Sequence, residues 1–296
     1  EIFAGGTFQF RGALLTDTGP VSMADNGIQL VLVDGPYGYQ VPLAGGTLAV
    51  IKDENFPGAD RVEFMDGYLV FNRPGNGVYF LSPLYAVTPV DGLLFATAES
   101  SPDRLVGHVV NHGNLWLGGT GSMEIWYNAG GADFPFARLD GGVLETGLAA
   151  AQSWAKGGEA VFWLGQDARG AGTVWMAQGY QPKRISTHAI EHAIQGYKGI
   201  ADALGWTEQR EGHLFYWLTF PTGNATWVYD ANTELWHERA YRDRNTNALG
   251  RHRANCHTFV FGRHLVGDYL DGRVYELDLN VYTDDGNELP AILQAP

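Results

Sequence analysis

Residues 214–229 read Leu-Phe-Tyr-Trp-Leu-Thr-Phe-Pro-Thr-Gly-Asn-Ala-Thr-Trp-Val-Tyr. An apolar and aromatic run comes first, a turn containing glycine follows, and a second run ends in a β-branched residue and an aromatic one. β-Branched and aromatic side chains favour strands, and glycine permits the backbone conformations of tight turns. The stretch therefore predicts two antiparallel strands that follow one another in the chain and are joined by a short turn.

This arrangement occurs six times along the chain. The second strand of each copy carries an aromatic residue near its end, and these residues are Tyr39, Tyr79, Trp126, Trp175, Tyr229 and Tyr275. Successive aromatic residues are 40, 47, 49, 54 and 46 positions apart. Four strands of ordinary length with their turns need about 40–50 residues. The repeat therefore predicts an all-β fold, a β-propeller with six visible blades and six or seven blades in total.

The recurring aromatic side chain has a structural explanation. A large flat ring buries much area, so one ring in each blade is expected to pack against a neighbouring blade. The pair Asp271-Gly272, between two strand-like runs, is typical of a tight hairpin turn. We therefore expect these rings to hold the blades together rather than to bind a cofactor, and we predict no cofactor.

The composition also indicates β-structure in one large domain. The chain has 296 residues, of which 40 are glycine, and aromatic residues make up 13%. A chain of this length can bury a full core without disulfides, and Cys256 is its only cysteine. We assign residues 1–280 to the propeller. Residues 281–296, which are acidic and contain prolines, are interpreted as an exit linker towards a further β segment.

One segment has the pattern of a helix. Ser186-Thr187 precedes the segment His188–Lys198, and Gly199 follows it. Ile190 and Ile194 fall on one face of this segment. A hydroxyl residue before an amphipathic run and a glycine after it are typical helix ends. We therefore predict one capped helix of about three turns, inserted between blades.

The formal net charge of the chain is −14. Proteins that bind phosphates need clustered lysine and arginine, whereas Lys52 is the only basic residue between Arg11 and Arg61. We therefore expect no sequence-specific binding of nucleic acid. Nowhere do about 18 apolar residues run together, so we also expect no membrane partner.

Arginines are more frequent in the last third of the chain, where they could meet an acidic protein surface. A solvated rim is the simpler explanation for them. The candidate contacts with another subunit or a partner protein are Arg239, Arg242, Arg244, Arg251 and Arg253.

Two clusters suggest a metal site. His188, Glu191 and His192 match the H-x-x-E-H pattern of inverted zinc peptidases, which needs two histidines one helical turn apart. A third ligand on another helix is missing, so a helix that covers the side of the propeller is the expected explanation. The second cluster, His252 with Cys256-His257, lacks the paired spacing of structural zinc. We predict no metal site and no catalytic residues.

An alternative function follows from the propeller itself. The turns Gly172–Trp175 and Thr222–Trp227 faintly resemble the Asp-box turns of sialidases, so a propeller that binds or hydrolyses host glycans is the alternative. Sialidases hold a carboxylate with an arginine cluster, and arginines are sparse before Arg169. The acidic turns Asp230–Glu234 and Asp284–Glu288 could hold calcium, although ordinary surface turns have the same composition. We expect no enzyme.

Several further segments are recognisable by their residues, and together they extend over most of the chain. They are Phe95-Ala96-Thr97-Ala98-Glu99, Glu124-Ile125-Trp126-Tyr127-Asn128, Gly179-Tyr180-Gln181-Pro182, Leu235-Trp236-His237-Glu238-Arg239, Leu249-Gly250-Arg251-His252-Arg253 and His264-Leu265-Val266-Gly267-Asp268-Tyr269. In their order and spacing these segments resemble one family, the packaged-DNA stabilisation proteins of short-tailed phages, which form the tail hub or head-completion ring.

This resemblance implies a structural virion protein. It implies a homo-oligomeric ring of six subunits that joins below the portal after DNA packaging, closes the exit channel and seats later tail parts. The implied partners are a portal-side adaptor protein and a tail needle or tailspike. The implied location is the tail of the virion, after assembly in the host cytoplasm. The resemblance also implies a longer chain, with residues before Glu1 and after Pro296.

Overall fold

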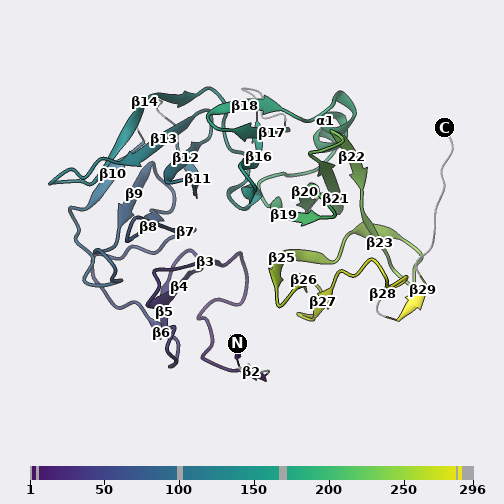
Figure 1. The fold of residues 1–296 in the computed structure, drawn as a ribbon, viewed down its shortest axis with the longest axis horizontal. Helices are drawn as coiled ribbons and strands as arrows, with labels where there is room; N and C mark the ends of the chain where they lie inside the picture. Colours follow the sequence, from purple (N-terminus) through teal and green to yellow (C-terminus); the bar gives the residue numbers. More distant parts are fainter. Residues whose placement is uncertain (1, 5–6, 99–102, 167–171, 285, 289–296) are drawn as a thin grey trace.

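The computed structural model describes residues 2–4, 7–98, 103–166, 172–284 and 286–288. Small antiparallel sheets are arranged around a common centre, and the chain passes from one sheet to the next in sequence order (Figure 1). Five of these sheets have four strands and the sixth has three. The fold is therefore a β-propeller with six blades, as the repeat predicts.

Within every blade the strands follow one another in chain order, so each blade is an antiparallel meander. Blade 1 consists of β3 (Ser22–Asp25), β4 (Gln29–Val33), β5 (Gly38–Pro42) and β6 (Ala49–Val50). Blade 2 consists of β7 (Val62–Met65), β8 (Tyr68–Asn72), β9 (Val78–Leu81) and β10 (Phe95–Thr97). Blade 3 consists of β11 (Leu105–Asn111), β12 (Asn114–Gly119), β13 (Met123–Asn128) and β14 (Phe136–Leu144).

The later blades follow the same plan until the last. Blade 4 consists of β15 (Ala155–Gly157), β16 (Ala160–Gln166), β17 (Gly172–Gln178) and β18 (Gln181–Arg184). Blade 5 consists of β19 (Leu204–Arg210), β20 (His213–Phe220), β21 (Ala225–Asp230) and β22 (Leu235–Glu238). Blade 6 consists of β25 (Ala254–Val260), β26 (Arg263–Asp268) and β27 (Val274–Glu276).

In the part of the chain that the structure describes, three hairpins lie outside the blades. They are β1 (Ile2–Ala4) with β2 (Thr7–Gln9), β23 (Ala240–Arg242) with β24 (Leu249–Arg251), and β28 (Thr283–Asp284) with β29 (Asn287–Glu288). The last hairpin falls within the predicted exit linker, whose remainder from residue 289 on lies outside the described residues. A short 3-10 helix, η1 (Ala151–Ser153), precedes blade 4.

Apolar side chains fill the spaces between consecutive blades. Among the described residues, the cluster between blades 4 and 5 has fifteen buried members, including Phe162 and Tyr216, whose rings stack at 4.9 Å. The cluster between blades 5 and 6 has five, namely Trp206, Trp217, Val228, Ala254 and Val266. Because burial of apolar area is the main stabilising term, blade 6 is held to its neighbour more weakly than blade 5 is.

Five of the six recurring aromatic side chains pack between blades, as predicted. Tyr79 and Trp126 meet between blades 2 and 3, with ring centroids 5.6 Å apart. Trp175 packs between blades 3 and 4, Tyr229 between blades 4 and 5, and Tyr275 between blades 5 and 6. The repeat in the sequence is therefore a repeat of contacts between blades.

Tyr39 is the exception. Its hydroxyl accepts a hydrogen bond from the Leu15 amide at 2.8 Å and donates one to Asp34 at 2.7 Å. The ring is 1% exposed because the N-terminal segment covers it. The predicted packing between blades is wrong here, since among the described residues no apolar cluster joins blade 6 to blade 1.

The predicted helix is present but shorter. Helix α1 (His188–Gln195) begins at its predicted cap, where the Thr187 side chain accepts a hydrogen bond from the Ile190 amide. It ends at Gly196 rather than Gly199, because Tyr197 turns away to pack on Phe220 at 4.9 Å. None of the described helices is long and apolar enough to cross a membrane.

Candidate interaction surface on blades 5 and 6

A hairpin formed by β23 and β24 projects from the connection between blades 5 and 6. Figure 1 shows it leaving the ring after β22, on the side away from the centre. Asp243 closes its turn by accepting hydrogen bonds from the Asn245 amide at 2.9 Å and from the Thr246 amide at 2.8 Å. These bonds stabilise the carboxylate and lower the pKa of Asp243. The turn therefore holds its shape through its own polar groups, without support from a core.

The five arginines singled out in the sequence all lie on or beside this hairpin, and they fall into two groups. Arg239, Arg242 and Arg244 are exposed, whereas Arg251 and Arg253 are half-buried. Within the described part of the chain, Arg239 and Arg242 make no ion pair. Arg244 donates a hydrogen bond to the Asp284 carbonyl at 2.5 Å. The exposed group is thus available to another protein.

Arg253 is a structural residue. Its guanidinium group forms ion pairs with Asp268 at 2.5 Å and with Asp271 at 3.1 Å. It also lies over the rings of Tyr241, at 5.2 Å, and Tyr275, at 5.8 Å. Burial disfavours its charge, but the pairing with Asp268 outweighs burial and raises the pKa of Arg253. This side chain therefore connects the hairpin to blade 6.

Arg251, the last residue of β24, has a similar role. Its guanidinium carbon lies 3.5 Å from the centre of the Tyr269 ring, a cation–π contact. Its backbone amide donates to the Asn224 side chain of blade 5 at 3.1 Å. The base of the hairpin is thereby fixed to both neighbouring blades, although its tip carries exposed arginines.

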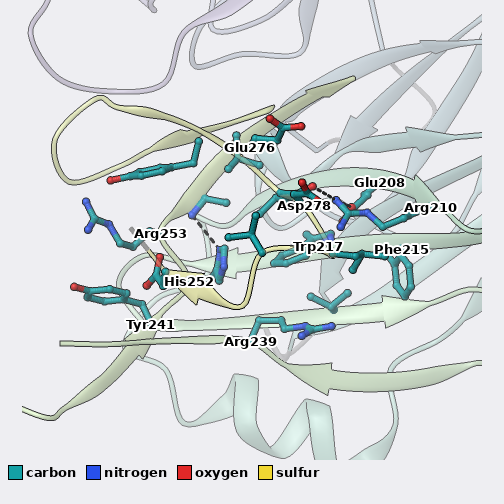
Figure 2. Close-up of a pocket in the computed structure, with 18 of the residues that line it drawn as sticks. Glu208, Arg210, Phe215, Trp217, Arg239, Tyr241, His252, Arg253, Glu276 and Asp278 are labelled. Atoms are coloured by element: carbon teal, nitrogen blue, oxygen red, sulfur yellow. Dashed lines mark hydrogen bonds and ion pairs between the residues drawn. The ribbon is translucent and has the colours of Figure 1, made fainter. Parts of the chain in front are cut away.

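A cavity of about 820 Å³ lies between blades 5 and 6, bounded by the chain that follows β27 (Figure 2). Phe215, Trp217 and Tyr241 contribute aromatic surface to its wall. Arg210 pairs with Glu208 there and donates to a backbone carbonyl of the chain after β27 at 2.9 Å. Aromatic and arginine side chains are enriched in protein–protein interfaces. The cavity therefore has the lining of a protein contact surface.

His252 lies in the wall of this cavity and is held neutral. Burial, assisted by the nearby charge of Arg239, lowers the pKa of His252 to about 4. Its Nδ1 accepts a hydrogen bond from the Ala254 amide at 3.1 Å, and its ring packs edge-on against Trp217 at 5.2 Å. A proton on this ring would disrupt both the hydrogen bond and the packing between blades 5 and 6.

Blade 6 also exposes large apolar side chains that sequence analysis did not single out. Phe261 is 71% exposed, and the others on blade 6 and the following segment are Phe259, Tyr269, Leu270, Val274, Leu279, Val281 and Tyr282. Exposed apolar surface beyond scattered single residues marks interaction sites. Most of them lie in turns or in the segment after β27, where strand periodicity gives no sign of burial or exposure.

The zinc-peptidase pattern on α1 has another role. Glu191 accepts hydrogen bonds from Arg184 Nε and Ser186 Oγ, each at 2.6 Å. Burial raises the pKa of Glu191, but these partners outweigh it and the net effect lowers the pKa. The carboxylate is therefore fixed as an ion-pair partner, while His188 and His192 are exposed.

The other metal candidates are also accounted for by contacts within the protein. His257 lies between Trp206, at 5.0 Å, and His264, whose Nδ1 is 3.0 Å from His257 Nε2, while Cys256 is exposed. Asp230 is saturated by donors from its own turn and by His213 at 2.8 Å. No group of three His, Cys, Asp or Glu side chains able to hold a metal occurs in the described residues.

The sialidase-like turn likewise has local uses. Thr222 donates to Asp202 through both its amide, at 2.8 Å, and its hydroxyl, at 2.7 Å. Asn224 accepts from Arg251, as described above. These contacts fix the turn between β20 and β21 to its surroundings. The turn is thus explained by hairpin geometry without a glycan.

Comparison with solved structures supports the architecture. The chain is similar to a putative 6-phosphogluconolactonase from Bacteroides fragilis, with 10% identity, a TM-score of 0.53 and coverage of 87% of this chain and 82% of that chain. It is also similar to a chain in a mitotic checkpoint complex, with 12% identity, a TM-score of 0.51 and coverage of 94% and 88%. Such low identities show the fold alone. No curated protein matches the chain.

The comparison with family models identifies the family. The model described as bacteriophage P22 Gp10, β-propeller, matches residues 7–282, which include all six blades. The family is a phage stabilisation family, and the fold it describes is the one seen here. The chain therefore belongs to the P22 Gp10 family of phage stabilisation β-propellers and is a structural protein of the phage particle.

Proposed function

We propose that this chain is a subunit of the ring that completes the head of a short-tailed phage after DNA packaging. In this role it closes the exit channel, acts as the tail hub and seats later tail parts. The family match over residues 7–282 carries the proposal. The chain acts by fitting between other proteins, with no turnover and no cofactor.

The charge of the chain suits a channel for DNA. With a net charge of −14, a ring of such subunits would present an acidic wall that repels the phosphate backbone. Tight binding to phosphates requires clustered basic residues and would hold the DNA in place. An acidic wall lets DNA slide during ejection, so retention before ejection comes from a blocked exit rather than from adhesion.

The centre of each propeller is not the path for DNA. Lys156 of blade 4 reaches Glu63 of blade 2 at 3.2 Å and the Val110 carbonyl of blade 3 at 3.0 Å. Arg61 pairs with Glu63 at 2.9 Å and donates to the Ala151 carbonyl at 3.1 Å. Three blades are bridged by these side chains, so a double helix can pass only through a ring made of several subunits.

The contacts that build such a ring are assigned to blades 5 and 6. A closed ring needs a head-to-tail interface, and permanent interfaces bury about 2,000 Å² or more. The exposed Arg242 and Arg244 on the β23–β24 hairpin can meet acidic surface on a neighbouring subunit, the portal-side adaptor, the needle or the tailspike. The exposed apolar residues of blade 6 supply area beside them.

Electron microscopy of particles that lack this protein tests the role. We expect full heads to form during packaging and then to lose their DNA, and the added protein to restore DNA-filled particles. Intact infectious particles in the absence of the protein would contradict the proposal. If the added protein restores DNA-filled particles, the particles lacked only this part and were otherwise correctly assembled.

Charge reversal tests the contact surface. We expect the double variant Arg242→Glu and Arg244→Glu to lower the yield of infectious particles by at least about tenfold, because like charges facing one another at an interface are strongly unfavourable. The matched control reverses Arg73 and Arg104, which are exposed on blades 2 and 3, and should leave the yield unchanged. Equal yields from both variants would refute the assignment of the hairpin as a contact.

A further inference from the structure

A smaller hollow lies between blades 5 and 6, where β19 and β25 end. Its volume is about 390 Å³, and it is lined by Gln209, Arg210, Glu211, His257, Phe259 and His264. Arg210 and Glu211 also line the larger cavity, so the two spaces adjoin. The interface between blades 5 and 6 is therefore open at the ends of these strands as well as along the cavity.

The charged groups of this hollow differ in their partners. The Arg210 guanidinium group pairs with Glu208 and donates to the Leu277 carbonyl at 2.9 Å, so it is already engaged. Glu211, in the turn that follows β19, is exposed and makes no ion pair in the described residues. The hollow therefore offers a carboxylate to a cation from another molecule.

Aromatic rings lie beside this carboxylate. The Phe259 ring is 62% exposed and lies 4.8 Å from the His264 ring. Burial lowers the pKa of His257, so this ring is neutral at about pH 7 and does not repel a cation. A guanidinium group can pair with a carboxylate through two hydrogen bonds and stack on an aromatic face. The hollow therefore has the chemistry of a site for an arginine side chain.

The β23–β24 hairpin presents such an arginine to another molecule. Tyr241 lines the larger cavity, where the Arg253 guanidinium group lies 5.2 Å from its ring (Figure 2). Because side chains alternate along a strand, the next residue, Arg242, points away from the cavity. Arg242 is exposed and makes no ion pair in the part of the chain that the structure describes. It is therefore directed away from the hollow of its own chain.

Apolar side chains accompany both charged groups. Leu249 of β24 pairs directly with Arg242 of β23, so the two side chains lie on the same side of the hairpin. Leu249 is 56% exposed. Near the hollow, Leu279 in the turn after β27 is 51% exposed. Arginine surrounded by apolar area is typical of the core of a protein interface.

We propose that the hollow receives the Arg242 side chain of a second copy of this chain. The guanidinium group pairs with Glu211 and stacks on Phe259 of that copy. Because the hairpin and the hollow are different surfaces, each copy gives an arginine to one neighbour and receives one from the other, which is the head-to-tail contact of a closed ring. This inference rests on the proposed ring and names the two surfaces that meet in it.

Exchange of the two charges tests the contact in phage particles. Arg242→Glu should lower the yield of infectious particles, because two carboxylates then face each other. Adding Glu211→Arg in the same chain should recover the yield by at least about tenfold, because the pair is restored with its charges reversed. The matched control adds Glu159→Arg instead, at the corresponding exposed turn of blade 4, and should recover nothing.

Recovery specific to Glu211→Arg would identify a second copy as the partner, because the acidic surface of any other protein stays unchanged in this experiment. No recovery from Glu211→Arg would overturn the proposal and would favour the adaptor, the needle or the tailspike as the partner of Arg242. Equal recovery from Glu211→Arg and Glu159→Arg would also overturn it, because the effect would then depend on net charge alone.

Thiol cross-linking is a second test that does not depend on charge. The chain carries Glu211→Cys and Arg242→Cys, with Cys256→Ser to remove the natural thiol. A short bifunctional thiol reagent applied to particles should join the chains into a series of dimers and longer multiples on a denaturing gel. The control pair, Glu211→Cys with Arg73→Cys on blade 2, should give single chains.

The cross-linking result also separates this contact from the proposed function. Single chains from Glu211→Cys with Arg242→Cys would overturn the contact, and a series that stops at dimers would overturn its head-to-tail arrangement. Either result leaves the proposed function intact if particles without the protein still lose their DNA. Particles that keep their DNA without the protein would instead refute the proposed function.

Discussion

The interface between blades 4 and 5 and the interface between blades 5 and 6 are built from the same repeat but differ in depth, that is, in the number of apolar residues that they bury. Among the described residues, the former has fifteen buried apolar residues and is extended by α1, whose Ile190 and Ile194 join it. The latter has five, and beside it lies the cavity of about 820 Å³. Blade 5 therefore packs against apolar clusters on both sides, whereas in the described residues blade 6 packs against a cluster on one side.

This difference indicates that one part of the molecule stabilises the fold and another part is used in assembly. Blades 2 to 5 form a continuous packed body, each enclosed by apolar clusters on both sides. Blade 6 and the segment after it carry a group of exposed apolar residues, and the neighbouring β23–β24 hairpin carries the exposed Arg242 and Arg244. A protein that functions by fitting between partners needs both parts, because a surface reserved for partners cannot also be used for its own core.

The largest expected effect is in the deep interface. Phe162→Ala should lower the free energy of unfolding by about 3–5 kcal/mol, because it removes a fully buried ring stacked on Tyr216 and leaves a cavity. Denaturant unfolding followed by tryptophan fluorescence measures this change. Phe259→Ala on blade 6 is the control, and with its ring 62% exposed it should have little effect. Similar losses from both variants would remove the contrast between the interfaces.

The next effect concerns the charged connection between the hairpin and blade 6. Arg253→Ala should lower the free energy of unfolding by about 3 kcal/mol, because Asp268 would remain buried without its partner. Arg263→Ala removes an exposed ion pair with Glu276 and should change the free energy of unfolding by less than about 1 kcal/mol. Calorimetry on both variants measures the difference. A loss of less than about 1 kcal/mol for Arg253→Ala would show that this ion pair does not hold the blade.

Acid should loosen the shallow interface. The pKa of His252 is about 4 in the folded protein and about 6.5 in an unfolded chain. Between these values the unfolded state binds a proton that the folded state does not, so stability falls as the pH drops from about 6.5 to about 4. At about pH 5 the loss from this group is about 2 kcal/mol.

His252→Gln isolates this contribution. The difference between the free energies of unfolding at about pH 7 and about pH 5 should shrink by about 2 kcal/mol in the variant, because one of the titrating groups is gone. His237→Gln, at an exposed position on β22, is the matched control for loss of an imidazole. In the unmodified protein, the protection of blade 6 amides relative to their intrinsic exchange rate at each pH should decrease with acid. An unchanged pH difference in His252→Gln would contradict a neutral buried ring.

The smallest expected effect is on the stability of the free chain when an exposed arginine is removed. Arg242→Ala should change the free energy of unfolding by less than about 0.5 kcal/mol, because the side chain makes no ion pair in the described residues. Thermal unfolding measures this. A large loss would mean that Arg242 supports the fold rather than a partner, and would shift the proposed contact surface elsewhere.

The parts of the fold that depend on local sequence were predictable. The turn glycines, the strand alternation and the aromatic residue in each copy identified the blades, because blade formation needs only neighbouring segments of the chain. The start of α1 was predictable from Thr187, a local cap. Its end was not, because the packing of Tyr197 on Phe220 brings together residues from different elements.

The parts that depend on what lies beside a blade were not predictable. Nothing in the sequence around Tyr39 distinguishes it from Tyr275, although the first is covered by the N-terminal segment and the second by a blade. The arginines illustrate the same limit. Composition selected five of them, but only the distances separate Arg253, bound to Asp268, from the exposed Arg242.

Hydrogen exchange on the free chain and on the chain assembled in phage particles tests the account most directly. We expect assembly to slow exchange in the β23–β24 hairpin, in blade 6 and at the side of blade 5 that faces it, by at least about tenfold at the protected amides, and to leave blades 2 to 4 nearly unchanged. If protection appeared only in blades 2 to 4, or nowhere, the assignment of blades 5 and 6 as the assembly surface would be wrong.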